Sequence, residues 1–347
     1  MHAGFQVPLA RMKLTHCSGW RCRMHCTINR WRGRSRPEKE WGSAVRESLI
    51  KLGPAFVKLG QIMSVRSDLI PASLVGELQK LQSTVPPFPY EVVRSRIEEE
   101  TGEPLEKMFR SFSEKPLAAA SIGQVHEAEL LDGTRVAVKI KRPGIDAVVR
   151  RDMEVLVWLA EHVEQHSAAA ARFRPVASAQ ELREYTLREL DFRHEARVAK
   201  RLSDLYGDRP GVRVPAVYES RTGLLVMEFI EGVELDDLEG LDRQGVDRGD
   251  LVRVALEAVL AQIFEFGLFH GDPHPGNLHV TSSGELVFLD FGIFGEFDER
   301  MRRLTGMLML SLVRGDVELA TGYLLRMATL SPDADPAAFR EEIGARY

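Results

Sequence analysis

The chain has 347 residues, which is enough for two domains or lobes with large hydrophobic cores. Its apolar fraction of 44% and charged fraction of 28% are ordinary for a soluble globular protein, and its net charge of −5 gives no reason to expect nucleic acid as a general partner. The longest nearly unbroken apolar stretch near the C-terminus, residues 304–313, is about half of what a helix needs to cross a bilayer. We therefore expect no membrane span in this sequence.

Residues 1–37 form a basic segment without an acidic side chain. All three cysteines of the chain lie in it, next to two histidines: Cys17, Cys22, Cys26, His16 and His25. A zinc-binding knot is conceivable, but the spacing has no Cys-x-x-Cys pair. Acid-poor, arginine-rich leaders also occur as organellar transit peptides, and a translation start placed too far upstream would look the same. We favour a disordered leader outside the fold.

Helical periodicity begins after this leader. Apolar residues recur at helical spacing from about residue 38 to 84, and the sequence Pro-Pro-Phe-Pro at 86–89 ends that run. Residues 90–110 are typical of a short helical hairpin. We therefore assign residues 38–110 to an N-terminal helical extension.

The pattern changes after residue 110, and it predicts an α+β fold. The predicted elements are two short strands within 117–141 around an Asp-Gly turn, helices at 146–166 and 176–206, and strands at 212–217 and 223–229. From residue 249 the chain is predicted to be mostly helical, with one buried stripe from Leu251 through Val259 to Phe266. We divide this part into two lobes, at 111–230 and 231–347.

Two short motifs near the C-terminal end carry the chemistry. His-Gly-Asp-Pro-His-Pro-Gly-Asn occupies 270–277, and Leu-Asp-Phe-Gly follows at 289–292. In kinase-type enzymes the first Asp orients the attacking group, an Asn five residues later holds magnesium, and the Asp of Asp-Phe-Gly holds magnesium between the phosphates. We predict these roles for Asp272, Asn277 and Asp290, because amide and carboxylate oxygens suit Mg²⁺. A turn rich in proline and glycine would explain either motif alone, but not both in order.

A lysine upstream completes the charge pattern. Lys139 ends an alternating strand with the sequence Val-Ala-Val-Lys, similar to the kinase Val-Ala-Ile-Lys signature, and a buried lysine must be paired with anions. Its helix partner is expected within 176–206, where Glu189 and Glu195 lie roughly 120° apart if one helix carries both. The two glutamates can therefore serve different lysines, and we assign Glu195 to Lys139.

The expected phosphate loop departs from the kinase pattern Gly-x-Gly-x-x-Gly-x-Val. Only the third glycine is kept, and alanines replace the first two, so the loop should be stiffer and argues against an ordinary protein kinase. A segment at 225–230 is similar to the strand-to-hinge segment whose backbone pairs with an adenine edge, although a plain buried strand is the alternative. The predicted nucleotide contacts are Ala118, Ala119, Ala120, Ser121, Ile122, Gly123, Gln124, Val125, Lys139, Glu195, Met227, Glu228 and Phe229.

Together these motifs resemble the UbiB/AarF family of atypical, protein-kinase-like proteins. The marks of that family are Lys-x-Gly-Gln at 58–61, the alanine-rich loop at 118–126, Glu-x-Asp at 189–191 and the loop at 270–277. The resemblance covers about residues 41 to 300 and implies a two-lobed kinase-like fold with an extra N-terminal helical segment.

The resemblance also implies roles for the covering helix and the ligands. In the family the Lys-x-Gly-Gln helix is thought to fold over the site where a protein substrate would lie. Carried over, Lys58 would face Glu189, and Lys58 and Gln61 would share one helix face as a regulatory lid. The family binds ATP or ADP with Mg²⁺, ATPase activity fits it better than protein phosphorylation, and it is implicated in ubiquinone (coenzyme Q) biosynthesis and isoprenoid-lipid work.

Two departures from the family pattern affect the expected size and location. Only 57 residues follow Asp290 in the 347-residue chain, and no Ala-Pro-Glu segment closes an activation loop. Many relatives also carry hydrophobic C-terminal helices that reach the membrane, which this sequence lacks. We expect a short or truncated C-lobe in a cytoplasmic protein with peripheral membrane contact, whose partners are nucleotide and isoprenoid-lipid or quinone-biosynthesis proteins.

Two other functions stay open beside an atypical kinase or ATPase. A small-molecule phosphotransferase of the aminoglycoside or choline kinase type shares the His-Gly-Asp…Asn loop but lacks the covering helix and the alanine-rich loop. A non-catalytic, nucleotide-sensing scaffold of a lipid-biosynthetic complex would bind nucleotide without turnover. Because every polar catalytic position is intact, the sequence favours an enzyme.

Overall fold

The structure, a computed structural model, describes residues 38–64, 71–82, 86–171, 173–207, 209–271, 273–328, 330 and 334–346. The predicted leader at 1–37, with its cysteines, lies outside the described residues, as does Asp272. The side chains of Lys58 and Gln61 are also outside the described set, although their backbone belongs to a helix.

The chain divides into two compact units. Unit 1 consists of Met1–Phe88, Ala118–Gln124 and Lys141–Leu190. Unit 2 consists of Pro89–Leu117, Val125–Ile140 and Asp191–Tyr347. The predicted domain boundaries stay a prediction.

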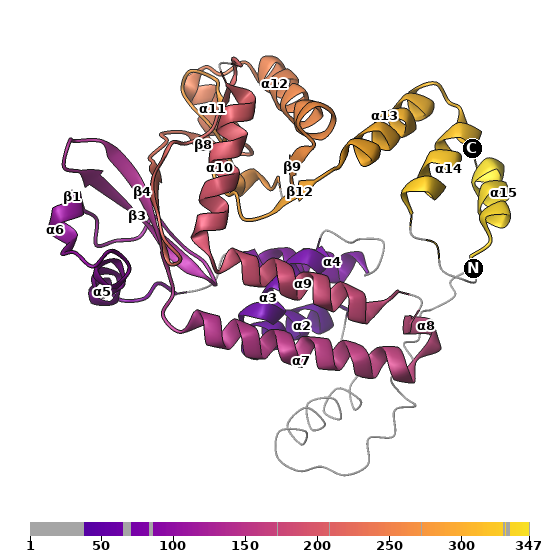
Figure 1. The fold of residues 1–347 in the computed structure, drawn as a ribbon, viewed down its shortest axis with the longest axis horizontal. Helices are drawn as coiled ribbons and strands as arrows, with labels where there is room; N and C mark the ends of the chain where they lie inside the picture. The colour runs from indigo at the N-terminus through magenta and orange to yellow at the C-terminus, as the bar shows by residue number, and fades with distance from the viewer. Residues whose placement is uncertain are drawn as a thin grey trace, which may run out of the picture. The chain divides into compact units, whose positions relative to one another are not determined.

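Unit 1 is built mainly from helices, as the periodicity predicts for its N-terminal part. They are α2 (Glu38–Leu52), α3 (Pro54–Ser64), α4 (Ala72–Leu78), the 3₁₀ helix η2 (Gln79–Gln82), α7 (Ile145–His166), α8 (Ala168–Ala171) and α9 (Pro175–Glu189). Helices α7 and α9 run side by side (Figure 1) and enclose a core with α3, in which Phe56, Met153 and Leu182 are buried. Each large side chain buried there contributes about 1.5–3 kcal/mol.

Helix α7 shows how the sequence produces this packing. It starts directly after Gly144, whose φ of +70° is a left-handed conformation that glycine adopts without strain. The buried residues Ile145, Val149, Met153 and Leu156 then recur at intervals of four, four and three along the helix. This spacing places them in one stripe, which faces the core of unit 1.

The helical region at 176–206 is interrupted, and this corrects one expectation. Helix α9 ends at Glu189, and α10 (Phe192–Tyr206) begins after Asp191. Asp191 has an extended backbone, and its side chain accepts a hydrogen bond from the backbone N–H of Arg193, so it is the N-cap of α10. Glu189 and Glu195 therefore lie on different helices, and the angle of roughly 120° expected for one helix is wrong.

Unit 2 contains most of an antiparallel sheet with the strand order β1-β3-β4-β7-β6. Its strands are β1 (Phe109–Phe112), β3 (Gly123–Leu130), β4 (Arg135–Lys141), β6 (Val217–Ser220) and β7 (Leu224–Glu228), and β2 (Ala118–Ala119) pairs with β3. The predicted hairpin is confirmed: Gly133 takes a φ of +90° in the turn and donates its N–H to the carbonyl of Leu130. Helices α5 (Tyr90–Thr101) and α6 (Leu105–Met108) precede β1, so the predicted helical hairpin gives way to a strand at Phe109.

The single strand predicted at 212–217 is wrong. Its first part, β5 (Val212–Arg213), pairs in parallel with β11, whereas β6 pairs with β7 in the other sheet. Pro215 lies between the two strands, and it has no N–H to donate to a ladder. The chain therefore changes sheets at this proline.

The C-terminal part of unit 2 combines helices with two small sheets, of order β5-β11-β10-β8 and β12-β9. Its elements are β8 (Val233–Glu234), α11 (Leu238–Gln244), α12 (Arg248–Leu260), the π-helix η3 (Ala261–Phe266), β9 (Leu268–His270), η4 (Pro275–Asn277), β10 (Leu278–Val280), β11 (Leu286–Phe288), β12 (Phe294–Glu296), α13 (Glu299–Val313), α14 (Val317–Met327) and α15 (Pro336–Arg346). In α12, Leu251 and Ala258 are buried as predicted, but Val259 is 42% exposed because it lies about 80° around the helix from Leu251.

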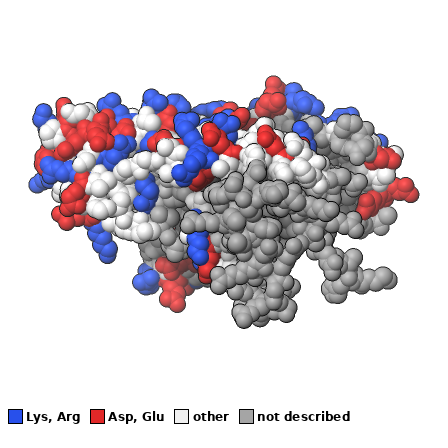
Figure 2. Space-filling view, turned by 90° about the horizontal axis from the view of Figure 1, so that it is seen from below, with Lys and Arg blue, Asp and Glu red and all other residues white. Residues whose placement is uncertain are grey.

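Charged residues of both signs are mixed on the surface. Figure 2 shows blue and red side chains side by side over the part of this face that the structure describes. Exposed pairs such as Arg253 with Glu257, 3.1 Å apart, each contribute little to stability. Among the described residues, the structure contains no helix whose length and apolar character would let it cross a membrane.

We predict that His126 makes the stability of unit 2 sensitive to acid. It is fully buried in β3, with Nδ1 2.7 Å from the carbonyl oxygen of Ser113, and burial lowers the pKa of the imidazole. Its contribution is therefore present above the ordinary histidine pKa of about 6.5 and is lost as the pH falls, because the unfolded chain takes up the proton more readily. Urea unfolding from neutral to mildly acidic pH should show a smaller loss in His126→Gln than in the parent. The exposed His166→Gln is the control, and equal slopes in all three proteins would refute this role.

Candidate active site

An ion pair between β4 and α10 forms the centre of the candidate site. The ammonium of Lys139 lies 2.8 and 2.7 Å from the two carboxylate oxygens of Glu195. Along β4, Val138 and Ile140 are fully buried, and Lys139 alternates with them onto the other face of the strand. Glu195 comes from the first turn of α10. The pairing assigned from the sequence is therefore confirmed.

Burial disfavours the charged form of Glu195 within this pair. Glu195 is only 5% exposed, and this burial raises the pKa of its carboxyl above the ordinary value, against the opposing effect of the Lys139 ammonium. The nearby carboxylate of Asp290 raises that pKa further, whereas a hydrogen bond from the backbone N–H of Phe291 lowers it. The Lys139 side chain keeps 26% exposure and lies 5.1 Å from the centre of the Phe192 ring. Glu195 is thus the buried anchor, and Lys139 is the more accessible partner.

Asp290 brings a second carboxylate to the same lysine. Its Oδ1 lies 3.9 Å from the Lys139 Nζ, and its side chain is 42% exposed. The same oxygen accepts a hydrogen bond of 3.0 Å from the N–H of Gly292, which orients the carboxylate within its turn. Phe291 is fully buried and anchors this turn in unit 2. The Asp-Phe-Gly motif therefore presents a partly exposed oxygen ligand beside a cation.

Strand pairing brings Asn277 close to this turn. Strands β10 and β11 are antiparallel, with Leu278 opposite Phe288, so the residue before β10 and the residue after β11 are neighbours. The N–H of Leu289 donates to the carbonyl of Asn277 across this end, at 3.0 Å. Asn277 and Asp290 thus lie at the same end of the β10–β11 hairpin.

This donor set suits a magnesium ion. Mg²⁺ prefers hard oxygen ligands and is commonly bound by one or two carboxylates together with waters and substrate phosphates. Asn277 and Asp290 supply an amide and a carboxylate oxygen. The described residues contain no cluster of three or more His, Cys, Asp and Glu side chains that could hold a metal by themselves. The residues present therefore fit a Mg²⁺ that is shared with phosphate.

A buried polar network holds the start of the loop at 270–277. Gln262, in the π-helix η3, accepts a hydrogen bond of 2.9 Å from the backbone N–H of His270 and donates one of 3.0 Å to the hydroxyl of Tyr206. The Tyr206 hydroxyl donates to the carbonyl of Ala258, and burial raises the pKa of Tyr206 to about 12. Our sequence reasoning missed Gln262 and Tyr206. The only available signal was a glutamine within an apolar helical run.

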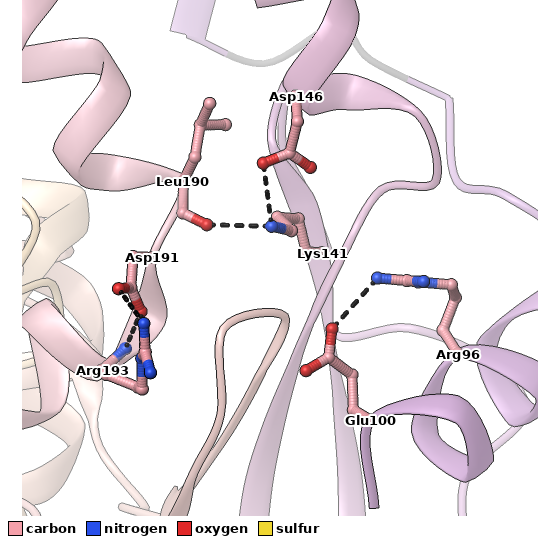
Figure 3. A network of polar contacts seen from close by, with 7 residues as sticks. All are labelled: Arg96, Glu100, Lys141, Asp146, Leu190, Asp191 and Arg193. Carbon is pink, nitrogen blue, oxygen red and sulfur yellow. Dashed lines mark hydrogen bonds and ion pairs between the residues drawn. The ribbon is translucent and has the colours of Figure 1, made fainter.

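A second lysine of β4 lies at the break between α9 and α10. Lys141 is buried, and its ammonium lies 3.0 Å from the carbonyl of Leu190 and 3.1 Å from a carboxylate oxygen of Asp146 (Figure 3). Cations are favourable at the C-terminus of a helix, where carbonyls lack helical partners. Lys141 therefore stabilises the end of α9, and the sequence analysis did not identify it.

The predicted Glu-x-Asp motif lies across this break. Asp191 caps α10 and also forms a two-bond ion pair with Arg193, at 2.9 and 2.8 Å, as Figure 3 shows. Its carboxylate is therefore engaged locally. Glu189 ends α9 in unit 1, and the predicted pairing with Lys58 involves a side chain outside the described residues, so it stays a prediction.

Residues 118–124 of the alanine-rich loop belong to unit 1, and Val125 and His126 belong to unit 2. Ala118 and Ala120 are exposed, and Gly123 and Gln124 are buried. The N–H of Ala120 donates to the carbonyl of Gly123 at 2.8 Å, which closes a tight turn. The loop forms this turn without the two glycines of ordinary kinases.

The predicted adenine-contacting segment is the end of β7 and the residue after it. Met227 is buried, and the carboxylate of Glu228 forms an ion pair with Arg213. The N–H of Glu228 donates to the carbonyl of Ala216, and the N–H of Phe229 donates to that of Arg135. These N–H groups serve the sheet, and a contact with adenine stays a prediction.

We predict that Lys139→Met destabilises the protein most strongly at neutral pH. Removing one partner of a buried ion pair costs about 3–5 kcal/mol, because the other charge stays buried. Without Lys139, burial and the nearby Asp290 carboxylate raise the pKa of Glu195 with little opposition, so stability is lost as the pH rises and partly regained as it falls. Urea unfolding near neutral and near acidic pH measures this change, with the exposed Lys200→Met as the control. A loss of stability that does not depend on pH would contradict a charged Glu195.

Comparison with known proteins places this chain in a family. Residues 80–324 match the ABC1 atypical kinase-like domain. The chloroplastic protein ACTIVITY OF BC1 COMPLEX KINASE 7 of Arabidopsis thaliana is 37% identical over 307 residues, which are 88% of this chain and 44% of that protein. The "Probable protein kinase UbiB" of Pseudomonas aeruginosa (strain UCBPP-PA14) is 39% identical over 276 residues, 78% of this chain and 52% of that protein.

A solved structure agrees with the assignment. The Rv3197–erythromycin complex from Mycobacterium tuberculosis is 29% identical in sequence and matches with a TM-score of 0.56, covering 82% of this chain and 72% of that one. The chain spans about half the length of the curated relatives it matches. The resemblance and the α+β, kinase-like fold predicted from the sequence are both confirmed. This chain belongs to the ABC1 atypical kinase-like family, together with the relatives named UbiB.

Proposed function

We propose that this protein is an atypical kinase-like phosphotransferase or ATPase that binds ATP or ADP with Mg²⁺. The observation that carries the proposal is the position of the Lys139 ammonium, 2.7 Å from the buried carboxylate of Glu195 and 3.9 Å from the partly exposed carboxylate of Asp290. A lysine held in this way offers a fixed positive charge to a phosphate, with an oxygen ligand for a metal beside it.

Lys139 would neutralise the α- and β-phosphates of the nucleotide. Glu195 holds the ammonium through both carboxylate oxygens, so its position is determined before the nucleotide binds. Catalysis of phosphoryl transfer depends mainly on positioning and on stabilisation of charge, and a preorganised cation provides both. Glu195 acts here as a positioning residue for Lys139.

Asn277 and Asp290 would hold the magnesium ion. When bound, Mg²⁺ neutralises charge on the phosphates and on the phosphoryl group that is transferred. The Gly292 N–H that donates to Asp290 and the Leu289–Asn277 backbone bond keep both ligands at one end of the β10–β11 hairpin. Asp272, which lies outside the described residues, would orient the attacking water or hydroxyl group.

We infer that the attacked acceptor is water or a small molecule, not a protein side chain. The loop that corresponds to the kinase glycine-rich loop has alanines in its first two glycine positions and closes through the Ala120–Gly123 hydrogen bond. The Lys-x-Gly-Gln helix, α3, would cover the place of a protein substrate. The resemblance to the UbiB family supports a role in ubiquinone or other isoprenoid-lipid biosynthesis, in the cytoplasm with peripheral membrane contact.

The primary test is nucleotide binding and turnover in charge variants. Lys139→Ala and Asp290→Asn should each lower ATP turnover by about a hundredfold or more, because each removes a charge that stabilises the transition state. Both should also reduce the thermal stabilisation produced by MgATP. Asp204→Asn, an exposed substitution on α10, is the matched control and should keep parental values. Undiminished ATP hydrolysis in purified Asp290→Asn would exclude the proposed mechanism.

A separate prediction concerns the covering helix. Lys58→Ala should loosen α3 over the site and thereby change the ratio of ATP to ADP affinity. Titration of both nucleotides against the parent, Lys58→Ala and the exposed control Lys51→Ala measures this ratio. An unchanged ratio in Lys58→Ala would count against a lid role for α3.

A further inference from the structure

The segment Pro86–Phe88 is rich in proline, and we call it the proline strap. It follows the N-terminal helices in the chain, and two of its three residues are prolines. Proline has no N–H, so Phe88 offers the only backbone donor of the strap, while all three residues offer carbonyls. Such a segment cannot pair as an ordinary strand. Side chains from elsewhere in the chain supply hydrogen bonds to Pro86 and Phe88.

Gln124 supplies two of these bonds. Its Oε1 accepts a hydrogen bond of 2.9 Å from the N–H of Phe88, and its Nε2 donates one of 3.3 Å to the carbonyl of the same residue. The side-chain amide thus imitates the backbone of a neighbouring strand. Gln124 is 2% exposed, and an apolar replacement would remove both of these bonds from the half-buried Phe88. Gln124 is also the last residue of the alanine-rich loop that belongs to unit 1.

Arg142 connects the strap with the same loop. Its guanidinium donates to the carbonyl of Pro86 at 2.9 Å and to that of Ala120 at 3.4 Å, and lies 5.2 Å from the centre of the Phe88 ring. Its backbone N–H donates to the carbonyl of Ile122 at 2.7 Å. Arg142 therefore contacts the strap twice, through a hydrogen bond to Pro86 and through the ring of Phe88. It also donates hydrogen bonds to two carbonyls of the loop, those of Ala120 and Ile122.

These contacts lie within unit 1, and the strap and the loop belong to one compact body with α2, α3 and α4. Lys139, Glu195, Asn277 and Asp290 all belong to unit 2. The alanine-rich loop is therefore grouped with the N-terminal helices and not with the strand that carries the lysine.

We propose that Gln124 and Arg142 are positioning residues that fix the alanine-rich loop to the proline strap. The loop lacks two of the glycines that make kinase loops mobile, and the strap restricts it further. A preorganised loop binds a ligand with a smaller ordering cost, so the strap sets the nucleotide affinity of the loop. This last step rests on the proposed function, whereas the coupling of the loop to the strap does not.

The coupling is tested by amide hydrogen exchange on the full chain without nucleotide. Gln124→Leu and Arg142→Met each remove strap contacts, and exchange at residue 88 and at 118–124 should become at least about tenfold faster. Exchange at 136–140, in β4, should stay at the parental rate. Arg142→Lys keeps one donor for the strap and should restore part of the protection. Arg150→Met, an exposed substitution on α7, should match the parent.

Rates at 118–124 within about twofold of the parent in the folded variants would overturn the coupling. If Gln124→Leu does not fold, Arg142→Met compared with Arg142→Lys decides the question.

The effect of the strap on nucleotide affinity is tested by titrating the same proteins with MgADP. The dissociation constant should rise about tenfold in Gln124→Leu and Arg142→Met and recover in Arg142→Lys, as expected for a loss of preorganisation. A loosened loop with parental MgADP affinity would overturn the effect of the strap on binding. A parent protein that binds no MgADP would refute the proposed function, and the exchange rates alone would then decide the coupling.

Discussion

The buried ion pair between Lys139 and Glu195 is the interaction on which the candidate site depends. A glutamate that is almost fully buried requires a cation, because an isolated charge in such a place is very costly. This requirement fixes the first turn of α10 against β4 and places the ammonium next to Asp290. Loss of either partner would leave the other charge buried alone, so the pair matters to the stability of unit 2, and it also holds the ammonium that would neutralise a phosphate in the proposed function. The Lys139 ammonium and the Glu195 carboxylate therefore matter both to stability and to the proposed chemistry.

The break between α9 and α10 has its own local contacts. A continuous helix would carry Glu189 and Glu195 on one axis, whereas the chain turns at Leu190 and Asp191. Asp191 caps the new helix, and Lys141 holds the carbonyl of Leu190 at the end of the old one. Two lysines of one strand, Lys139 and Lys141, thus serve the two helices separately. The Glu-x-Asp motif lies at this turn, and its aspartate has a structural task in capping α10.

Local chemistry explains why much of the fold and of the site could be predicted. Helical periodicity identified the N-terminal helices, the Asp-Gly turn identified the β3–β4 hairpin, and the offsets around Asn277 and Asp290 identified the two loops at the end of the β10–β11 hairpin. The partner of Lys139 was also found, because a buried lysine limits the choice to nearby acidic residues. Two errors occurred where a segment was predicted as one element: Pro215 divides a predicted strand, and Asp191 divides a predicted helical region.

The sequence by itself determined the family, the kinase-like α+β fold and the residues that carry charge, because these depend on residue type and on spacing along the chain. Only the tertiary structure decided the roles of Gln124, Lys141 and Gln262. Their partners Phe88, Leu190 and Tyr206 are 36, 49 and 56 residues away, and two of these partners accept or donate through backbone atoms that every residue has. A backbone carbonyl leaves no mark in the sequence. Which one a buried side chain will meet is decided when the chain packs.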